Sequence, residues 1–449
     1  MTTAAGLPPG PVTTPLQMFR VMFDPDTALL RMVRRYGDPL TDRSAGKPLV
    51  FSCTPEGAKQ ILTADPDTFA VPDPEFLTPI LGEHSVLFLV GERHRSERKL
   101  INPHFHGDRM RAYGDTVREV AERHIAAWRV GETWSALDQM QSISLEVIIR
   151  TIFGVERARV PEFRAAVIEW VTSFSPLIVF FRGLRRDFLG HGPWARLQRA
   201  RVAIDRMLDE EIASRRRVVS RDGTLGNDIL SRLMAARYED GSAMSDAQLR
   251  DELLTLLFAG HETTAISLAW VLYYLLSDPA LYARVRAEVD ALGSQPTAEA
   301  IVQLPLLSAV CNETLRLHPV VPILPPRRLQ RPFHFMGYEL PPDVMVSIGT
   351  LRLHKREDLY PKPYAFIADR FLNRTYSPFE YMPFGGGVRR CIGASFALYE
   401  MKIVLAMIVR STQLSLATDK PVRDQRRNAV LGPSHNLKLL LSSRRSVAG

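Results

Sequence analysis

The chain has 449 residues, of which 46% are hydrophobic and 24% are charged, and its formal net charge is +8. This composition is typical of a folded globular protein and excludes a chain that is disordered over most of its length. The charge alone is compatible with nucleic acid, an acidic protein partner or simple solubility. The three cysteines lie far apart and form no C-x-x-C pair, which indicates neither a disulfide framework nor a zinc site and fits the reducing cytoplasm best.

The beginning of the chain differs in composition from the rest. Residues 1–14 are rich in proline, glycine and threonine, which predicts a flexible lead-in. They contain no basic stretch followed by an apolar run, so we expect no signal peptide and no membrane anchor. Because no repeat, low-complexity tract or clear linker interrupts the remainder, we predict one domain over residues 15–449.

Elements of mixed type are predicted up to residue 91. A helical pattern runs over Leu16–Tyr36, and the apolar run Pro48–Phe51 predicts a strand of a small sheet. Residues 71–91 form a proline-rich loop that carries more apolar side chains than solvated loops usually do. A loop of this kind can cover a pocket.

Helical periodicity dominates residues 92–318, with breaks at 175–176 and 183–193. Ser245 and Gln248 predict a capping box that opens a helix ending before Pro279, on the order of 50 Å long. Its apolar stretch is interrupted by polar residues in the middle, so it is interpreted as a buried helix and not as a membrane span.

The pattern changes after residue 319. Short strands and proline turns are predicted over Pro319–Ser347, then an irregular stretch up to Cys391, and a last helix over 393–411. The whole sequence therefore predicts a mainly α protein with small β-sheets.

The middle of the long helix carries chemistry that an apolar helix does not need. Ala259 precedes Thr263 by four positions, so a small residue leaves room beside a hydroxyl on the same face. Gly260 costs roughly 1 kcal/mol against alanine in a helix, which suggests a use for it. The alternative is a threonine that bonds back to a helix carbonyl. His261 and Glu262 begin like a zincin H-E-x-x-H motif, but the second histidine is missing, so that metal hypothesis fails.

The most informative stretch precedes the last helix, where constrained residues stand at the spacing F-x-x-G-x-R-x-C-x-G: Phe384, Gly387, Arg389, Cys391 and Gly393. A cysteine in a glycine-rich loop beside arginines favours the thiolate, which can ligate iron. The spacing resembles the haem-binding loop of the cytochrome P450 family, in which the cysteine thiolate is the proximal ligand of haem iron. The alternative for this segment alone is a glycine-rich turn that ends in a structural cysteine.

The resemblance spans roughly residues 30–440 and implies the cytochrome P450 fold, with a long central helix crossing over the haem. It implies haem b (iron protoporphyrin IX) as cofactor and Cys391 as the axial ligand of the haem iron. Glu262 and Thr263 resemble the acid and alcohol pair of the family's oxygen-binding segment, to which Ala259 and Gly260 also belong.

Further residues correspond to family positions. His94, Arg98, Arg327 (in preference to Arg328) and Arg389 resemble the residues that hold the haem propionates. Glu313 and Arg316 resemble the E-x-x-R pair, and Arg370 is its third partner in the structural triad. The family usually has P-E-R-F around that arginine, so Ala368 and Asp369 depart from the pattern.

The expected activity is that of a monooxygenase, which inserts one oxygen atom from O2 into a hydrophobic small molecule by hydroxylation or epoxidation. A terpenoid, a fatty acid or a steroid-like molecule is the expected substrate. Candidates for the pocket wall are apolar residues from several segments: Phe76, Leu77, Ile80, Leu87, Phe88, Phe174, Phe180, Phe258, Val321, Leu324 and Leu431. Each of them fits a plain core position about as well.

We expect no fused reductase or flavin domain, so the resemblance implies a separate ferredoxin or flavodoxin as electron donor. We expect it at a basic proximal face that includes Arg389, Arg390 and the residues around Arg93, Arg95, Lys99, Arg109 and Arg111. Nucleic acid is not expected, because no aromatic residues interleave with these cations. A cytoplasmic monomer is expected. The alternatives are a haem-thiolate fatty-acid peroxygenase, against which Glu262 and Thr263 argue, and a non-enzymatic haem-binding or sensor protein, which should carry an output domain.

Overall fold

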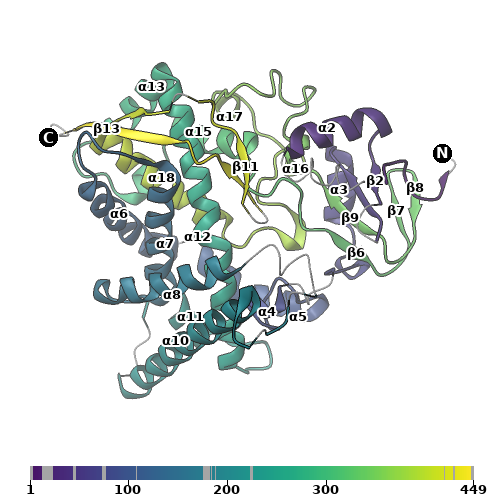
Figure 1. Ribbon diagram of the computed structural model, residues 1–449, viewed down its shortest axis with the longest axis horizontal. Helices are drawn as coiled ribbons and strands as arrows, with labels where there is room; N and C mark the ends of the chain where they lie inside the picture. Colours follow the sequence, from purple (N-terminus) through teal and green to yellow (C-terminus); the bar gives the residue numbers. More distant parts are fainter. Residues whose placement is uncertain are drawn as a thin grey trace. The chain divides into compact units, whose positions relative to one another are not determined.

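The computed structural model describes residues 4–12, 24–43, 47–72, 77–107, 109–174, 183, 185–187, 189–222, 226–418, 420–427 and 430–445, and Figure 1 draws them. The chain forms two compact units. The first comprises Met1–Pro72, Ala121–Met140 and Ala265–Gly449, and the second comprises Asp73–Val120 and Gln141–Thr264. Helices predominate and the sheets are small, as the sequence predicts. The division into a lead-in and one domain stays a prediction.

A five-stranded sheet of the first unit has the order β2-β3-β9-β6-β4. Strands β3 and β9 run parallel, and the other neighbours are antiparallel. Helix α3 (Pro55–Thr63) lies beside this sheet (Figure 1). Its residues Ala58 and Ile61 belong to the sheet's core cluster. The predicted strand at Pro48–Phe51 is confirmed as β3. The five strands are β2 (Leu40–Asp42), β3 (Leu49–Ser52), β4 (Phe69–Ala70), β6 (Arg327–Leu329) and β9 (Met345–Ile348).

The outer edge of β2 is covered by part of the predicted lead-in. The backbone N–H groups of Thr41 and Arg43 donate to the carbonyls of Pro9 (3.0 Å) and Pro11 (3.2 Å). The Thr41 hydroxyl also donates to the carbonyl of Pro8 at 2.7 Å. Residues 8–11 are therefore held against the sheet as a short extended segment.

Helix α2 (Pro25–Tyr36) forms the C-terminal part of the helix predicted over Leu16–Tyr36; residues 13–23 lie outside the described residues. The helix begins at Pro25, whose fixed φ and missing N–H suit the first helical position. The Asp24 side chain accepts from the Thr27 N–H at 3.2 Å and caps this end.

The rest of the first unit holds helices and smaller sheets. The hairpin β7–β8 pairs with β1, β5 pairs with β13 and β13 with β10, and β11 and β12 form a two-stranded hairpin. The last helix, predicted over 393–411, is confirmed as α18. The helices are α13 (Pro279–Asp290), α14 (Ala298–Val302), α15 (Pro305–Leu317), α16 (Thr350–Leu353), α17 (Arg370–Asn373) and α18 (Ala394–Ser411). The strands are β1 (Ala4–Ala5), β5 (Thr133–Ser135), β7 (Phe333–Phe335), β8 (Tyr338–Leu340), β10 (Thr412–Leu416), β11 (Asp424–Arg427), β12 (Val430–Pro433) and β13 (Lys438–Arg444).

The second unit is helical in its described residues. It contains most of the stretch predicted as helical over residues 92–318, the rest of which lies in the first unit. It adds a short helix, α4, within the predicted loop 71–91. Helices α6, α7 and α12 continue from one unit into the other. The helices are α4 (Thr78–Leu81), α5 (Gly91–Ile101), α6 (Arg109–Ala127), α7 (Ala136–Phe153), α8 (Val160–Ser173), α10 (Gly192–Asp222) and α11 (Ile229–Ala235).

The predicted long helix is α12 (Asp246–Ser277), with 32 residues. Its capping box is confirmed, because the Gln248 side chain accepts from the Ser245 N–H (2.8 Å) while the Ser245 hydroxyl accepts from the Gln248 N–H (3.2 Å). Within the described residues, no helix alone has the length and apolarity of a membrane span; α12 and α13 pass that test only together, bent by 112°.

Candidate functional site

Cys391 lies in the loop that leads into α18. Its backbone N–H donates to the Phe384 carbonyl at 2.9 Å, which closes the loop, and a 3₁₀ turn over Gly387–Arg389 lies inside it. The cysteine is exposed, whereas Cys53 and Cys311 are buried. The loop therefore presents one thiol outward and keeps its backbone in a fixed turn.

Glycines are required in this loop for two physical reasons. Gly385 and Gly387 have φ values of +64° and +60°, which non-glycine residues rarely adopt. A Cβ on Gly387 would also stand 2.6 Å from the backbone oxygen of Leu62, at the end of α3. Gly386 packs in the same way on the Leu62 side chain. The loop thus rests on Leu62, a contact that no sequence signal indicated.

The structure brings Glu313, Arg316 and Arg370 together. Arg316 donates to both carboxylate oxygens of Glu313 at 2.7 and 2.8 Å, and neither side chain is exposed. Arg370 donates through Nε to Glu313 at 3.3 Å. The spacing that predicted a shared helix face therefore gives a buried, bidentate ion pair with a second arginine beside it.

Arg316 also holds the segment between α16 and α17. It donates to the carbonyls of His354 and Pro363, each at 2.8 Å, and its guanidinium lies 4.9 Å from the centre of the Tyr360 ring. A charged group at zero exposure is tolerated because these acceptors replace its water. The segment between α16 and α17 is in this way braced from α15.

His354 is a supporting residue that the sequence did not indicate. Its Nε2 accepts from the Met382 N–H at 2.9 Å, just before the cysteine loop. Burial, with a smaller contribution from Arg316, lowers its pKa to about 3. The imidazole is therefore neutral at ordinary pH, as an acceptor must be. A single histidine in Leu351–His354 carries no pattern that marks this role.

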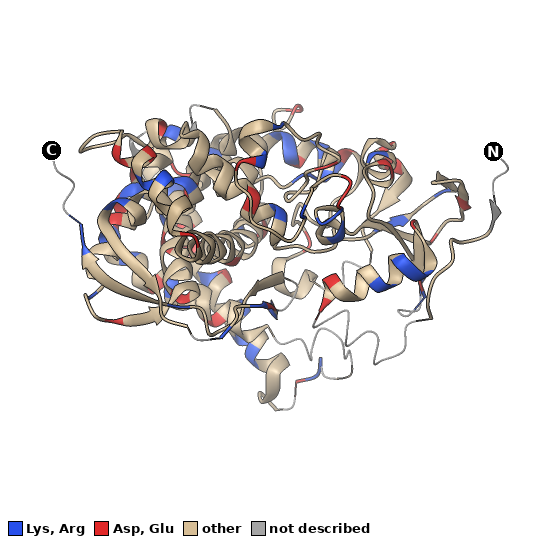
Figure 2. Cartoon of the chain, turned by 90° about the horizontal axis from the view of Figure 1, so that it is seen from above, with Lys and Arg blue, Asp and Glu red and all other residues tan. Residues whose placement is uncertain are grey.

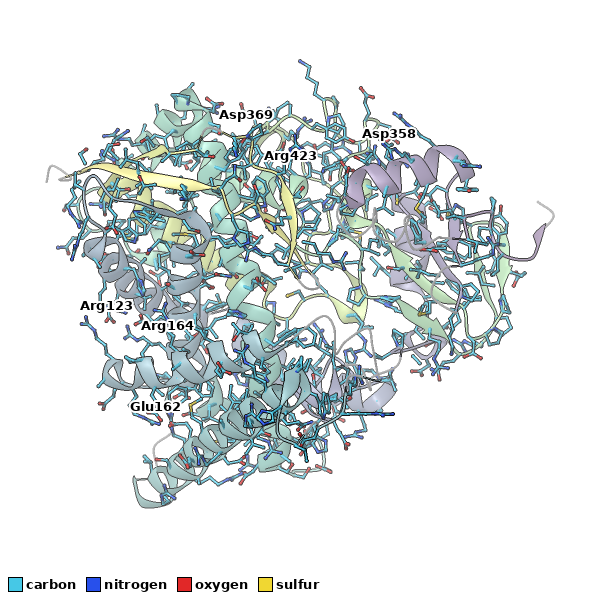
Figure 3. The ribbon with its side chains drawn as sticks, viewed as in Figure 1. Arg123, Glu162, Arg164, Asp358, Asp369 and Arg423 are labelled. Carbon is cyan, nitrogen blue, oxygen red and sulfur yellow. The ribbon has the colours of Figure 1, made fainter. Side chains whose placement is uncertain are left out.

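The structure shows where Ala368 and Asp369, which depart from P-E-R-F, are placed. Asp369 (labelled in Figure 3) pairs with Arg284 of α13 at 2.7 and 3.2 Å and lies at the surface. Ala368 is buried. Arg370 keeps its contact with Glu313, so the substitution changes a surface pair and not the triad.

Arg327 and Arg328 have different surroundings. Arg328 is at the surface and pairs with Asp343 at 3.0 Å. Arg327 is mostly buried, its guanidinium lies 5.4 Å from the centre of the Phe69 ring, and burial lowers its pKa to about 10. Within the described ranges no carboxylate pairs with it. A buried cation of this kind fits an anionic group that the protein itself does not supply.

In the middle of α12 the structure shows how Thr263 is bonded and what Gly260 packs against. The Thr263 hydroxyl donates to the Ala259 carbonyl at 2.9 Å, which is the local bond named as the alternative. Its oxygen can still accept. A Cβ on Gly260 would collide with the end of Ile148 on α7, so this glycine has a packing reason of its own. Glu262 is half-buried. Among the described residues no group of three or more His, Cys, Asp or Glu side chains could hold a metal ion.

His94 and Arg98 lie one turn apart on α5. His94 is 4% exposed and Arg98 is half-buried, so both face the interior more than solvent. Their side chains share a helix face, as the spacing predicts.

The candidate pocket residues fall into separate groups. In the second unit Phe258 contacts Phe174 edge-on, with ring centres 6.5 Å apart. In the first unit Leu431 donates its N–H to the Val320 carbonyl at 2.9 Å. Leu324 packs on the sheet core next to Gly385. Of the remaining candidates, Ile80 is buried, Leu77, Phe88 and Val321 are half-buried, Leu87 is exposed, and Phe76 and Phe180 lie outside the described residues.

The basic residues proposed to receive an electron donor are partly compensated. Arg95 pairs with Glu92 at 2.9 Å, and Lys99 pairs with Glu239. Arg93, Arg111 and Arg390 are exposed, and the Arg109 side chain is outside the described residues. Figure 2 shows acidic and basic residues intermingled along the chain. The positive charge that these residues can offer to a partner is therefore smaller than the number of arginines and lysines among them suggests.

Known proteins resemble this chain over its whole length. The family model described as Cytochrome P450 matches residues 5–441. The chain is 33% identical to cytochrome P450 135B1 of Mycobacterium bovis, an alignment that covers 100% of this chain and 94% of that protein. It is 34% identical to cytochrome P450 135A1 of Mycobacterium tuberculosis, with 100% and 98% covered.

Solved structures share the fold. The retinoic acid-bound cyanobacterial CYP120A1 has a TM-score of 0.86 at 26% identity, covering 98% of this chain and 100% of that chain. The haem domain of cytochrome P450DA has a TM-score of 0.86 at 24% identity, covering 99% of both chains. The chain therefore belongs to the cytochrome P450 family. It is a cytochrome P450 monooxygenase, and the family implies a haem cofactor.

The residues present fit a haem. Cys391 offers an exposed thiol, and a Cβ on Gly393 would meet no protein atom within 4 Å, so the backbone beside the cysteine faces open space. Arg327 is a buried cation whose charge a propionate can balance. A flat dianion with a central metal matches this combination of thiol, open backbone and cation.

Proposed function

We propose that this enzyme inserts one oxygen atom from O2 into a hydrophobic small molecule, using haem b and electrons from a separate protein. The single observation that carries the proposal is the closed loop that presents Cys391 ahead of α18, with its glycines fixed by the contact on Leu62. A haem held by a thiolate supplies activation of dioxygen and oxidation of the substrate. Binding of the haem, delivery of protons and binding of the substrate depend on groups of this chain.

Cys391 is proposed as the axial ligand, with Phe384 and Gly393 beside it. Arg327 is proposed to bind a propionate, because a buried cation without a carboxylate gains most from an added anion. His94, Arg98 and Arg389 are the other proposed propionate residues. Glu313, Arg316 and Arg370 brace the segment before the cysteine loop.

Thr263 and Glu262 are proposed to deliver protons to the reacting oxygen. The Thr263 hydroxyl donates its hydrogen to the Ala259 carbonyl, and its oxygen can still accept a further hydrogen bond. Glu262, one position earlier, supplies the acid. Ala259 and Gly260 keep the helix surface small beside this hydroxyl.

The substrate is proposed to be apolar and of terpenoid, fatty-acid or steroid-like character. The aromatic pair Phe174 and Phe258 supplies apolar surface in the second unit, and Val321 and Leu431 supply apolar surface in the first, each without a fixed charge. The related CYP120A1 is described as bound to retinoic acid, an apolar isoprenoid acid, which supports the terpenoid class.

The electron donor is proposed to be an acidic ferredoxin or flavodoxin. Exposed Arg93, Arg111 and Arg390 supply the positive charge that would attract it, although the pairs around Arg95 and Lys99 reduce that attraction. We further propose that the enzyme acts as a monomer in the cytoplasm, where the unpaired thiols Cys53 and Cys311 stay reduced.

The carbon monoxide difference spectrum of the reduced protein tests the proposed ligand. A red-shifted Soret band that disappears in Cys391→Ala is expected, and an unshifted band in the native protein would refute thiolate ligation. A panel of terpenoids, fatty acids and steroids, followed by the change in spin state, tests the substrate class. Turnover with hydrogen peroxide alone, and none with a ferredoxin system, would favour a peroxygenase instead.

A further inference from the structure

His318 ends helix α15 and joins three other parts of the first unit. Its Nδ1 lies 2.8 Å from Oδ1 of Asp424 in β11, and its Nε2 lies 2.7 Å from the hydroxyl of Tyr274 in α12. The ring stacks on Trp270, with centres 3.7 Å apart and planes at 14°. Only 11% of the side chain is exposed. Both ring nitrogens are thus hydrogen-bonded and one ring face is stacked. Ending a helix does not need these contacts.

The partner of His318 belongs to the hairpin β11–β12, which Figure 1 shows beside α15 and α12. Arg423, labelled in Figure 3, precedes its first strand. Leu431 in the second strand donates to the Val320 carbonyl at 2.9 Å. A Cβ on Gly432 would lie 3.1 Å from Ile266 of α12, so the backbone packs closely there. Asp424 is the polar attachment of the opposite strand.

The helix α12 presents one continuous stripe to this region. Ile266, Trp270 and Tyr274 are four positions apart and therefore share a face. The first packs on the hairpin, the second stacks on His318, and the third bonds to it. His318 is thus oriented from α12 before it reaches Asp424.

The charges support a directed hydrogen bond. Burial alone would raise the pKa of Asp424, but its interactions with His318 and Lys355 outweigh the burial, and the pKa is lowered. As a carboxylate Asp424 can only accept, so Nδ1 of His318 carries the hydrogen. Burial raises the pKa of Tyr274, which keeps its hydroxyl protonated and able to donate to Nε2.

We propose that His318 is a positioning residue that fixes the β11–β12 hairpin through Asp424 and thereby sets where the substrate is oxidised. Leu431 of this hairpin and Val321, next to the bonded Val320, are both candidates for the pocket wall. A shift of the hairpin changes the distance between these two walls. The statement about the substrate rests on the proposed function, whereas the statement about the hairpin does not.

Replacing His318 by asparagine or by glutamine distinguishes the hydrogen bond made by Nδ1 from the one made by Nε2. In His318→Asn the amide nitrogen takes the place of Nδ1 and can still donate to Asp424, whereas in His318→Gln it takes the place of Nε2 and reaches only Tyr274. We expect His318→Gln to raise hydrogen–deuterium exchange at the Leu431 amide about tenfold, the loss of one charge-assisted bond. We also expect it to change the ratio of products. His318→Asn should stay within about twofold of the native exchange rate.

The Leu324 amide, bonded to the Ile348 carbonyl at 3.0 Å, is an internal reference that should not change. His334→Gln is the matched control, because it removes the Nδ1 bond of His334 to Glu339 (2.8 Å) on an exposed hairpin of another sheet. If His318→Gln does not fold, Asp424→Ala removes the same bond from the other side and is expected to give the same exchange. Equal exchange in the Asn and Gln variants, or native exchange at Leu431 in Asp424→Ala, would overturn the proposal. A failed carbon monoxide spectrum would instead refute the proposed function and leave the exchange result intact.

Discussion

The guanidinium of Arg316 and the carboxylate of Glu313 form two hydrogen bonds of 2.7 and 2.8 Å with no exposed surface on either side chain. Because both charges are buried, each depends on the other and on the surrounding carbonyls for the solvation that it lost on folding. Removing one partner therefore destabilises the protein strongly, because the other is left as a buried charge without compensation.

Replacing Arg316 by leucine should lower the free energy of unfolding by about 3–5 kcal/mol, because Glu313 is left as a buried charge. Urea unfolding of the haem-loaded protein measures this. Arg284→Leu removes the half-exposed pair with Asp369 and serves as control, with an expected loss of less than about 1 kcal/mol. A similar loss of unfolding free energy in the two variants would show that the buried pair does not stabilise the protein more than the surface pair.

Two glycines that the sequence singles out should respond differently to alanine. Gly387→Ala combines a φ of +60° with a contact on the Leu62 backbone oxygen, which cannot move aside, and should cost about 2 kcal/mol or more. Gly260→Ala meets only the flexible end of Ile148 and gains helix propensity, so its change should stay within about 1 kcal/mol. Unfolding curves of both variants decide this, and the reverse order would contradict the geometry.

Gly393→Ala tests the open space beside Cys391. Its φ is −81°, and an added methyl group meets no protein atom within 4 Å, so the protein without haem should keep its stability. Haem affinity should fall by about tenfold if a macrocycle lies there, since overpacking by one methyl group costs on the order of 1–2 kcal/mol. Haem titration of the apoprotein measures it, and unchanged affinity would place the haem elsewhere.

Arg327→Leu should separate haem retention from protein stability. Without haem the variant loses a buried cation with no paired carboxylate, so the apoprotein should be as stable as the native one or more so. Transfer of haem to an acceptor protein should be about tenfold faster, because a charge-assisted bond to a propionate is lost. Arg328→Leu, which removes only the surface pair with Asp343, is the control. Equal rates in the two variants would argue against Arg327 as a propionate residue.

The stability of the protein should depend on pH through His354. Its pKa is lowered from 6.5 to about 3 on folding, so the unfolded chain binds a proton between these values and the folded chain does not. Stability from this group is therefore present above pH 6.5 and is lost as the pH falls, by up to about 1.4 kcal/mol per pH unit. Urea unfolding between pH 7 and pH 5 should show this slope in the native protein and less of it in His354→Gln. An identical slope in both would assign it to other groups.

Patterns of residues that lie close together in the sequence predicted much of the fold and several contacts of the candidate site. The capping box at Ser245 and Gln248, the buried face shared by Glu313 and Arg316, and the turn that ends at Cys391 all depend on residues within a few positions of one another. Periodicity and spacing report such relationships directly.

Contacts between distant segments could not be predicted in this way. Leu62 supports the cysteine loop from the end of α3, and β5 pairs with β13 from within a stretch that was predicted as helical. The supporting role of His354 could not be predicted, because a single histidine forms no repeating pattern in the sequence. These features depend on tertiary packing, which the pattern of one segment does not contain.

The short segment over residues 8–11 has a consequence for the behaviour of the protein in concentrated solution. Strand β2 is the outermost strand of its sheet, and an uncovered outer strand is a site where other chains can add. The carbonyls of Pro9 and Pro11 accept from the N–H groups of Thr41 and Arg43, and the carbonyls of Pro8 and Gly10 accept from the Arg43 guanidinium, so these acceptors are already occupied. The proline-rich start of the chain thus terminates the sheet, and removing it should favour aggregation through β2 while leaving the chemistry of the enzyme unchanged.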